Sequence, residues 1–117
     1  MVSELETFDR VNLGEIWNGI EVKLKAHGDN VEKLFYVRPG ADPSRIMVRV
    51  DGGKGVRLNE KGEIEVDTEL GIAKFSKPIA YQLEDGKRIS VSYELKEDLY
   101  TFRTGDYDRE KTLVIDP

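Results

Sequence analysis

Apolar and polar residues alternate along much of this chain with a period of two, the pattern of half-buried β-strands. The clearest case is the stretch Ile79–Leu95, in which Ile89, Val91, Tyr93 and Leu95 share one side and polar residues lie between them. A strand with this pattern turns one face to the core and the other to solvent. We therefore expect this stretch to be a β-hairpin around which the fold is organised.

In the first arm of this hairpin, Ile79 and Tyr81 share one face, and this alternation determines how many residues the turn must have. A three-residue loop, Glu84–Gly86, pairs Tyr81 with Ile89 and Ile79 with Val91, so that apolar residues share one face. It also places Gly86 where a hairpin with a bulge needs a positive φ.

A second hairpin has the same form. A Glu60–Gly62 loop pairs Leu58 with Ile64 and Val56 with Val66, and Gly62 again closes the loop. By the same argument, a link through 68–71 sets Ala73 and Phe75 opposite Val66 and Ile64, and a loop through 97–98 sets Tyr100 and Phe102 opposite Leu95 and Tyr93. Other predicted strands are Ile20–Lys25, Val31–Val37, Ile46–Val50 and Thr112–Ile115.

Two of these strands are apolar on successive residues, which predicts that both of their faces are covered. They are Val31–Val37, expected to be either central or covered on both sides, and Thr112–Ile115, expected to pair within the domain. Between strands, Pro39, Gly40 and Pro43 predict a loop, because a proline cannot donate to a ladder. Glu15–Gly19 predicts a turn through Asn18-Gly19. Residues 1–15 are expected to form an irregular N-terminal segment, with a short strand at Thr7–Leu13 as the alternative.

About ten short strands separated by turn signals are typical of an all-β domain. No stretch of helical length shows a 3.6-residue apolar period. The fold prediction is a single domain over residues 1–117, an antiparallel sandwich or open barrel joined by hairpins.

The composition and net charge argue against several classes of function. The net charge of −5 argues against nucleic-acid binding, which normally needs a basic face. No apolar run approaches a membrane span, so no membrane insertion is expected. The absence of cysteine excludes disulfides and thiol nucleophiles. Charged residues reach 35%, rich in lysine and glutamate, which favours a heat-adapted source. We expect no cofactor.

Two sets of residues are candidates for binding. Asp106, Asp108 and Glu110 are spaced two apart in a polar loop, and oxygen-rich loops of this kind bind calcium. The loop lacks a complete EF-hand pattern, and a solvated connection is the simpler interpretation. Trp17, Tyr100 and Tyr107 would stack sugar rings if they shared an exposed face, although core or edge packing also explains them.

Three motifs in order resemble one family. They are FYVRPGADPSRI at Phe35–Ile46, KPIAYQ followed by DGKR at Lys77–Arg88, and GDYD with LVIDP at the C-terminal end. The segment WNGI at Trp17–Ile20 resembles the entry motif of the same family. Together they are similar to the uncharacterised β-rich domain near the N-terminus of bacterial surface proteins with seven-bladed beta-propeller (SBBP) repeats.

This resemblance implies a non-enzymatic structural or interaction module of an exported or cell-surface bacterial protein. Its expected partners are neighbouring domains of the same chain, the propeller repeats. The start of the sequence carries no signal-peptide pattern, which would fit either a cytosolic protein or a domain cut from a longer exported chain. A carbohydrate- or calcium-binding module is the alternative from another class. An enzyme is not expected.

Overall fold

A computed structural model describes the backbone of residues 10–27, 30–50 and 55–117, and the side chains of residues 16–24, 33–50 and 55–117. The described residues form twelve β-strands and one short 3-10 helix, η1 (Pro43–Arg45). The strands are β1 (Arg10–Trp17), β2 (Ile20–His27), β3 (Asn30–Val37), β4 (Val48–Arg49), β5 (Gly55–Leu58), β6 (Ile64–Thr68), β7 (Gly71–Phe75), β8 (Ile79–Gln82), β9 (Arg88–Ile89), β10 (Val91–Lys96), β11 (Leu99–Thr104) and β12 (Leu113–Asp116).

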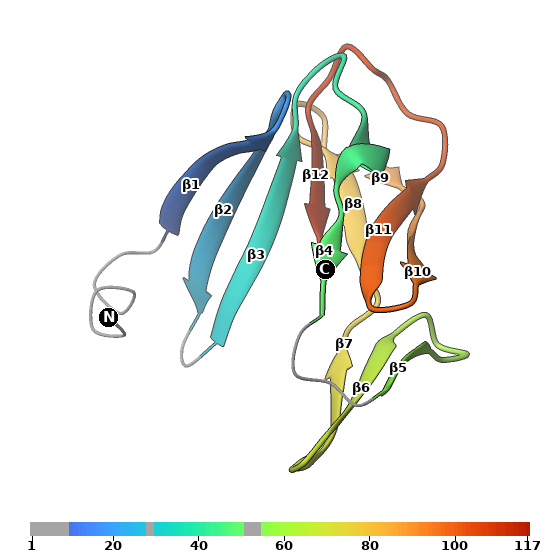
Figure 1. The fold of residues 1–117 in the computed structure, drawn as a ribbon. Helices are drawn as coiled ribbons and strands as arrows, with labels where there is room; N and C mark the ends of the chain where they lie inside the picture. Colours follow the sequence, from blue (N-terminus) through green and yellow to red (C-terminus); the bar gives the residue numbers. More distant parts are fainter. Residues whose placement is uncertain (1–9, 28–29, 51–54) are drawn as a thin grey trace.

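These strands form three antiparallel sheets. The main sheet has six strands in the order β1-β2-β3-β12-β8-β9, the front sheet has the order β10-β11-β4, and the lower sheet has the order β5-β6-β7. Figure 1 shows the front sheet lying over β12 and β8 of the main sheet, with the lower sheet beneath it. The predicted all-β fold class is confirmed: the architecture is sandwich-like, and the sheets do not close into a barrel.

The core lies between the main and front sheets and is rich in aromatic rings. Phe35 of β3 meets Phe102 of β11 edge to face, with ring centroids 5.5 Å apart. Phe102 also packs on Tyr93 of β10 at 5.6 Å. Burying these side chains stabilises the contact between the sheets by about 1.5–3 kcal/mol for each of them.

The last strand, β12, lies in the middle of the main sheet. Val114 pairs with Tyr36 of β3 on one side and with Tyr81 of β8 on the other. Leu113, Val114 and Ile115 are all fully buried. The prediction that Thr112–Ile115 pairs within the domain is therefore confirmed. The second strand with apolar residues on both faces, β3, is also central, between β2 and β12.

Several predicted registers are confirmed residue by residue. Leu58 pairs with Ile64 and Val56 with Val66, and Gly62 has the positive φ, +80°, that the three-residue loop requires. The pairs of β6 with β7 and of β10 with β11 are also those expected from the alternation. These hairpins are local, so the sequence pattern and the turn chemistry determine them together.

The register of the organising hairpin was predicted wrongly by one residue. Tyr81 pairs with Arg88 and Ala80 with Ile89, which leaves a four-residue turn, 83–86, closed by a hydrogen bond from the Gly86 amide to the Gln82 carbonyl at 2.7 Å. Gly86 nevertheless has the expected positive φ, +71°. This one-residue shift turns each side chain of the first arm to the face of the sheet opposite to the predicted one.

Ala80 and Gln82 therefore face the core, while Ile79 and Leu83 are exposed. Pairing with β12 accounts for this choice, because Ala80 lies beside Ile115 and so shares its core face. The second arm behaves as predicted, with Ile89, Val91 and Tyr93 buried.

The N-terminal prediction also needs correction. Residues 10–15 belong to β1, so the alternative of a strand in this region holds from Arg10 onward. β1 continues to Trp17, which confines the turn expected over Glu15–Gly19 to Asn18-Gly19. Gly19 has a φ of +77°, so that part of the prediction is confirmed. Residues 1–9 lie outside the described residues.

Candidate functional site

The predicted calcium loop is tied to the core by the backbone of Asp108, and the Asp108 carboxylate is engaged within the loop. The backbone amide of Asp108 donates to the side-chain carbonyl of buried Gln82 at 2.9 Å. The Asp108 carboxylate accepts from the amide of Glu110 at 2.9 Å and lies 4.0 Å from the ammonium group of Lys111. Asp106 is exposed. Within the described ranges, no group of three metal-ligating side chains comes together.

A polar network connects this loop to the 83–86 turn. Lys111 forms an ion pair of 2.8 Å with Asp85, and the Gln82 amide group donates to both Asp85 oxygens at 3.1 Å. The Asp85 carboxylate also accepts from the Lys87 amide at 3.0 Å. The bond from Lys111, followed by those from Lys87 and Gln82, holds the pKa of Asp85 well below its usual range. These groups fasten two loops that lie far apart in the sequence.

The predicted Pro39–Pro43 loop packs against the same part of the chain. Gly40, with a φ of +82°, donates its amide to the Arg109 carbonyl at 3.0 Å. Asp42 caps η1 by accepting from the Ser44 hydroxyl at 2.7 Å and from the Ser44 amide. These bonds lower the pKa of Asp42. Pro43 is buried, so this loop packs as part of the fold.

The three candidate stacking residues do not form one exposed strip. Tyr100 is only 4% exposed, and its ring packs in the core against Tyr93 at 5.2 Å. It therefore has to be removed from the set of surface ligands. Trp17 is half-buried and packs on Phe35 at 6.1 Å. The ring of Tyr107 is covered by the Arg109 guanidinium, 4.8 Å from its centroid.

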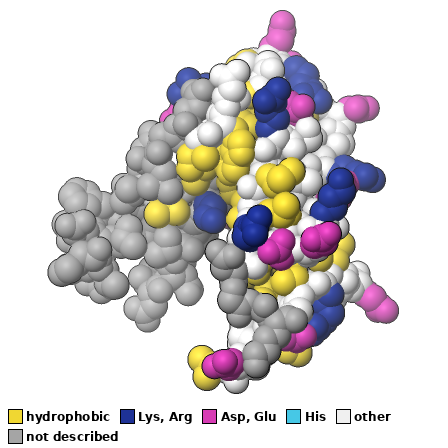
Figure 2. All heavy atoms as spheres, in the orientation of Figure 1, with side chains coloured by type: hydrophobic (Ala, Val, Ile, Leu, Met, Phe, Trp, Pro, Cys, Tyr) yellow, Lys and Arg dark blue, Asp and Glu magenta, His cyan; other side chains and the backbone are white. Residues whose placement is uncertain are grey.

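The front sheet presents a charged outer surface. Glu94 and Arg103 form an ion pair of 2.6 Å across β10 and β11, and Arg49 lies 3.9 Å from Asp98. Figure 2 shows charged side chains of both signs interspersed with hydrophobic side chains on this side of the molecule. Exposed pairs of this kind contribute little to stability, typically below about 1 kcal/mol each.

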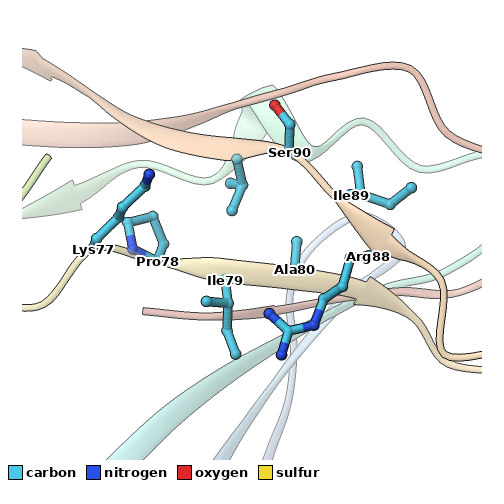
Figure 3. Close-up of a pocket in the computed structure, with 8 residues that line it drawn as sticks. Lys77, Pro78, Ile79, Ala80, Arg88, Ile89 and Ser90 are labelled. Atoms are coloured by element: carbon cyan, nitrogen blue, oxygen red, sulfur yellow. The ribbon is translucent and has the colours of Figure 1, made fainter.

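A cleft of about 290 Å³ lies beside the organising hairpin. It is lined by Lys77, Pro78, Ile79, Ala80, Arg88, Ile89, Ser90 and Val91, and we call it the wedge. It exists because β8 stays in the main sheet, whereas the opposite strand leaves that sheet after Ile89 and continues in the front sheet from Val91. Figure 3 shows the two arms diverging from the Ala80–Ile89 pair.

The wedge has an apolar floor and a basic rim. Pro78, Ala80, Ile89 and Val91 are buried, while the rim carries exposed Lys77 and Arg88. In Figure 3 the Lys77 ammonium rises towards the β10 arm, while the Arg88 guanidinium lies on the opposite side near Ile79. This arrangement suits an anionic group attached to an apolar body.

The lower sheet helps to place the Lys77 side chain. A Cβ built on Gly62, in the β5–β6 turn, would lie 3.5 Å from the Lys77 Cγ and Cδ atoms. Lysine stems pack on such surfaces while their charge stays in water. Sequence reasoning missed the wedge because the alternation runs unbroken through Ser90. The motif that contains Lys77 and Arg88 was the only signal pointing to this region.

Comparisons with known proteins place the chain in a family. Comparisons with the curated proteins and with the solved structures gave no match. No helix among the described residues is long and apolar enough to cross a membrane. The model of one family, described as a domain of unknown function (DUF7948), matches residues 1–117. The chain therefore belongs to the DUF7948 family.

Proposed function

We propose that this domain is a non-enzymatic structural and interaction module of an exported or cell-surface bacterial protein. In this proposal it precedes beta-propeller repeats and fixes their position. The link to propeller repeats comes from the sequence resemblance, and the observation that carries the positioning role is the place of β12 in the main sheet.

β12 is held on both sides, by β3 and by β8. A module joined after Pro117 would therefore be tethered to a central strand, not to a mobile arm. The fixed φ of a proline at this position would stiffen the connection. Motion of the next module would then be resisted by the ladder bonds and by the buried side chains of Leu113 and Ile115.

The polar groups of the loops support a structural role. Asp85, Asp108 and Lys111 hold two loops together, and Asp42 caps η1. Each of these acids is engaged with a hydrogen-bond donor supplied by the fold, which is how structural carboxylates behave. The lowered pKa values of Asp85 and Asp42 have causes within these loops.

Thermal unfolding of a longer chain tests this function. A protein that contains the domain and the repeats expected to follow it should unfold in one calorimetric transition, at a temperature above that of the isolated domain. Inserting a Gly/Ser linker after Pro117 is the matched control, because a flexible linker uncouples modules without altering either of them. Two transitions in the uninterrupted chain, at the temperatures of the separate parts, would contradict the proposal.

A further inference from the structure

The wedge is bounded at both ends. At its apex the last pair of the β8–β9 ladder joins Ala80 to Ile89. At its open end the Tyr93 hydroxyl donates to the Ser76 carbonyl at 2.8 Å, which pins the β8 arm to β10. An occupant can therefore span only a few residues of each arm, so it has to be a short extended segment and not a whole added strand.

The backbone of β10 offers hydrogen bonds to such an occupant. The Ser90 carbonyl accepts from the Gly105 amide at 2.9 Å, so Ser90 faces β11. In an antiparallel ladder, neighbouring residues point their N–H and C=O groups to opposite sides. The N–H and C=O groups of Val91 therefore point away from β11, towards the wedge. β10 is an edge strand of the front sheet, and Pro78 across the wedge has no N–H to offer.

The rim supplies charge complementarity. The whole chain carries a net charge of −5, yet the lining of the wedge includes two basic residues, Lys77 and Arg88, and no acid. The Lys77 ammonium points towards the β10 arm, and the Arg88 guanidinium lies at the outer side near Ile79 (Figure 3). Within the described part of the chain, neither cation takes part in an ion pair. Cations next to an outward-facing backbone N–H favour a carboxylate, and the buried floor favours an adjacent apolar side chain.

We propose that the wedge binds a short extended peptide segment of a partner module, in which an acidic residue stands next to an apolar one. The apolar side chain packs on Ala80 and Val91, and the carboxylate lies between Lys77 and the Val91 amide. Arg88 attracts a second acid at the outer rim. The inference rests on the proposed role as an interaction module, but it concerns a different surface from β12.

Peptide binding tests the inference. The probe is a fluorescent peptide Val-Glu-Val-Glu-Val, blocked at both ends, added to the ¹⁵N-labelled domain. We expect saturable binding by anisotropy, with the largest amide shifts at Val91 and its neighbours in the wedge. The double variant Lys77→Gln/Arg88→Gln should bind roughly threefold or more weakly, as the loss of two exposed charge contacts implies.

Three controls make the test specific. The variant Lys61→Gln/Lys96→Gln removes the same charge from exposed positions outside the wedge, and it should bind like the wild type. The charge-reversed Lys77→Glu/Arg88→Glu domain should prefer the corresponding Val-Lys-Val-Lys-Val peptide. An unchanged melting temperature of the variants shows that the fold is retained.

Absence of binding at millimolar peptide, equal binding of the lysine peptide by the wild type, or shifts that map elsewhere would each overturn the inference. None of these outcomes would affect the calorimetric test. Failure of the peptide-binding inference can therefore be distinguished from failure of the proposed function.

Discussion

Gln82 accepts a hydrogen bond of 2.9 Å from the backbone amide of Asp108, 26 residues away in the sequence. It is the buried polar residue of the described core and is only 2% exposed. Its amide group donates in turn to Asp85. This one side chain therefore joins the turn of the organising hairpin to the loop that leads into β12.

Replacing Gln82 tests how much this junction contributes. Gln82→Leu keeps the approximate volume but leaves the Asp108 amide without its acceptor. We expect the free energy of unfolding to fall by about 1–3 kcal/mol, the cost of an unsatisfied buried group. Urea denaturation measures it. Ser92→Ala, on the exposed face of β10, is the control and should change it by less than about 0.5 kcal/mol. Equal effects of the two variants on the free energy of unfolding would show that the hydrogen bonds of Gln82 do not stabilise the fold.

The ion pair between Lys111 and Asp85 predicts a pH dependence. The pKa of Asp85 is lowered in the folded state, so ionisation favours folding. This contribution is present in full above the unfolded value, roughly 3.9, and is lost as the pH falls through the lower folded-state pKa. Acid titration of the unfolding free energy should therefore show a decline below about pH 4.

Lys111→Met should make that decline shallower, because it removes the largest cause of the low pKa of Asp85. Asp106→Asn, an exposed acid in the same loop, is the matched control and should leave the slope close to that of the wild type. If Lys111→Met and the wild type have the same slope, the Lys111–Asp85 ion pair does not contribute to the acid dependence of stability.

The two turn glycines have positive φ angles, +80° at Gly62 and +71° at Gly86. Valine disfavours this region, so Gly86→Val should destabilise the domain by about 1–2 kcal/mol. Gly86→Asn should cost less, because asparagine tolerates the left-handed conformation. The same change in melting temperature for both variants would mean that side-chain bulk, and not the backbone angle, determines the effect.

Calcium should not stabilise the domain. The Asp108 carboxylate already accepts from the Glu110 amide and lies near the Lys111 ammonium, which opposes a cation at this loop. We expect the melting temperature to be the same with calcium and with chelator. A rise that grows with calcium concentration would indicate binding by mass action and would restore Asp106, Asp108 and Glu110 as ligands.

Local patterns were enough to predict much of the fold. The registers of β5–β6, β6–β7 and β10–β11 follow from alternation and turn length, because each pair is adjacent in the sequence. The register of β8 with β9 could not be obtained in this way. The burial of Gln82 depends on Asp108 and on the pairing of β8 with β12, both of which are long-range contacts.

The candidate site was less predictable than the fold. The alternation from Ile89 to Leu95 is continuous in the sequence, yet the chain changes sheets at Ser90, between β9 and β10. That change opens the wedge, and it depends on how two sheets pack, not on a local preference. Tyr100 was a candidate surface ligand, although the alternation of β11 places it on the same face as Phe102, where the aromatic core encloses it.

The most direct test of the central claim is the rotational tumbling of the domain within a longer chain. ¹⁵N relaxation of residues in β3, β12 and β8, measured with the repeats attached, reports whether the domain turns alone. If β12 directs the chain into a docked module, the correlation time should be that of the whole body, and the Leu113–Ile115 amides should be as rigid as those of β3. A correlation time equal to that of the isolated domain, with the residues after Ile115 moving freely, would show that β12 leads into a linker and would contradict the account.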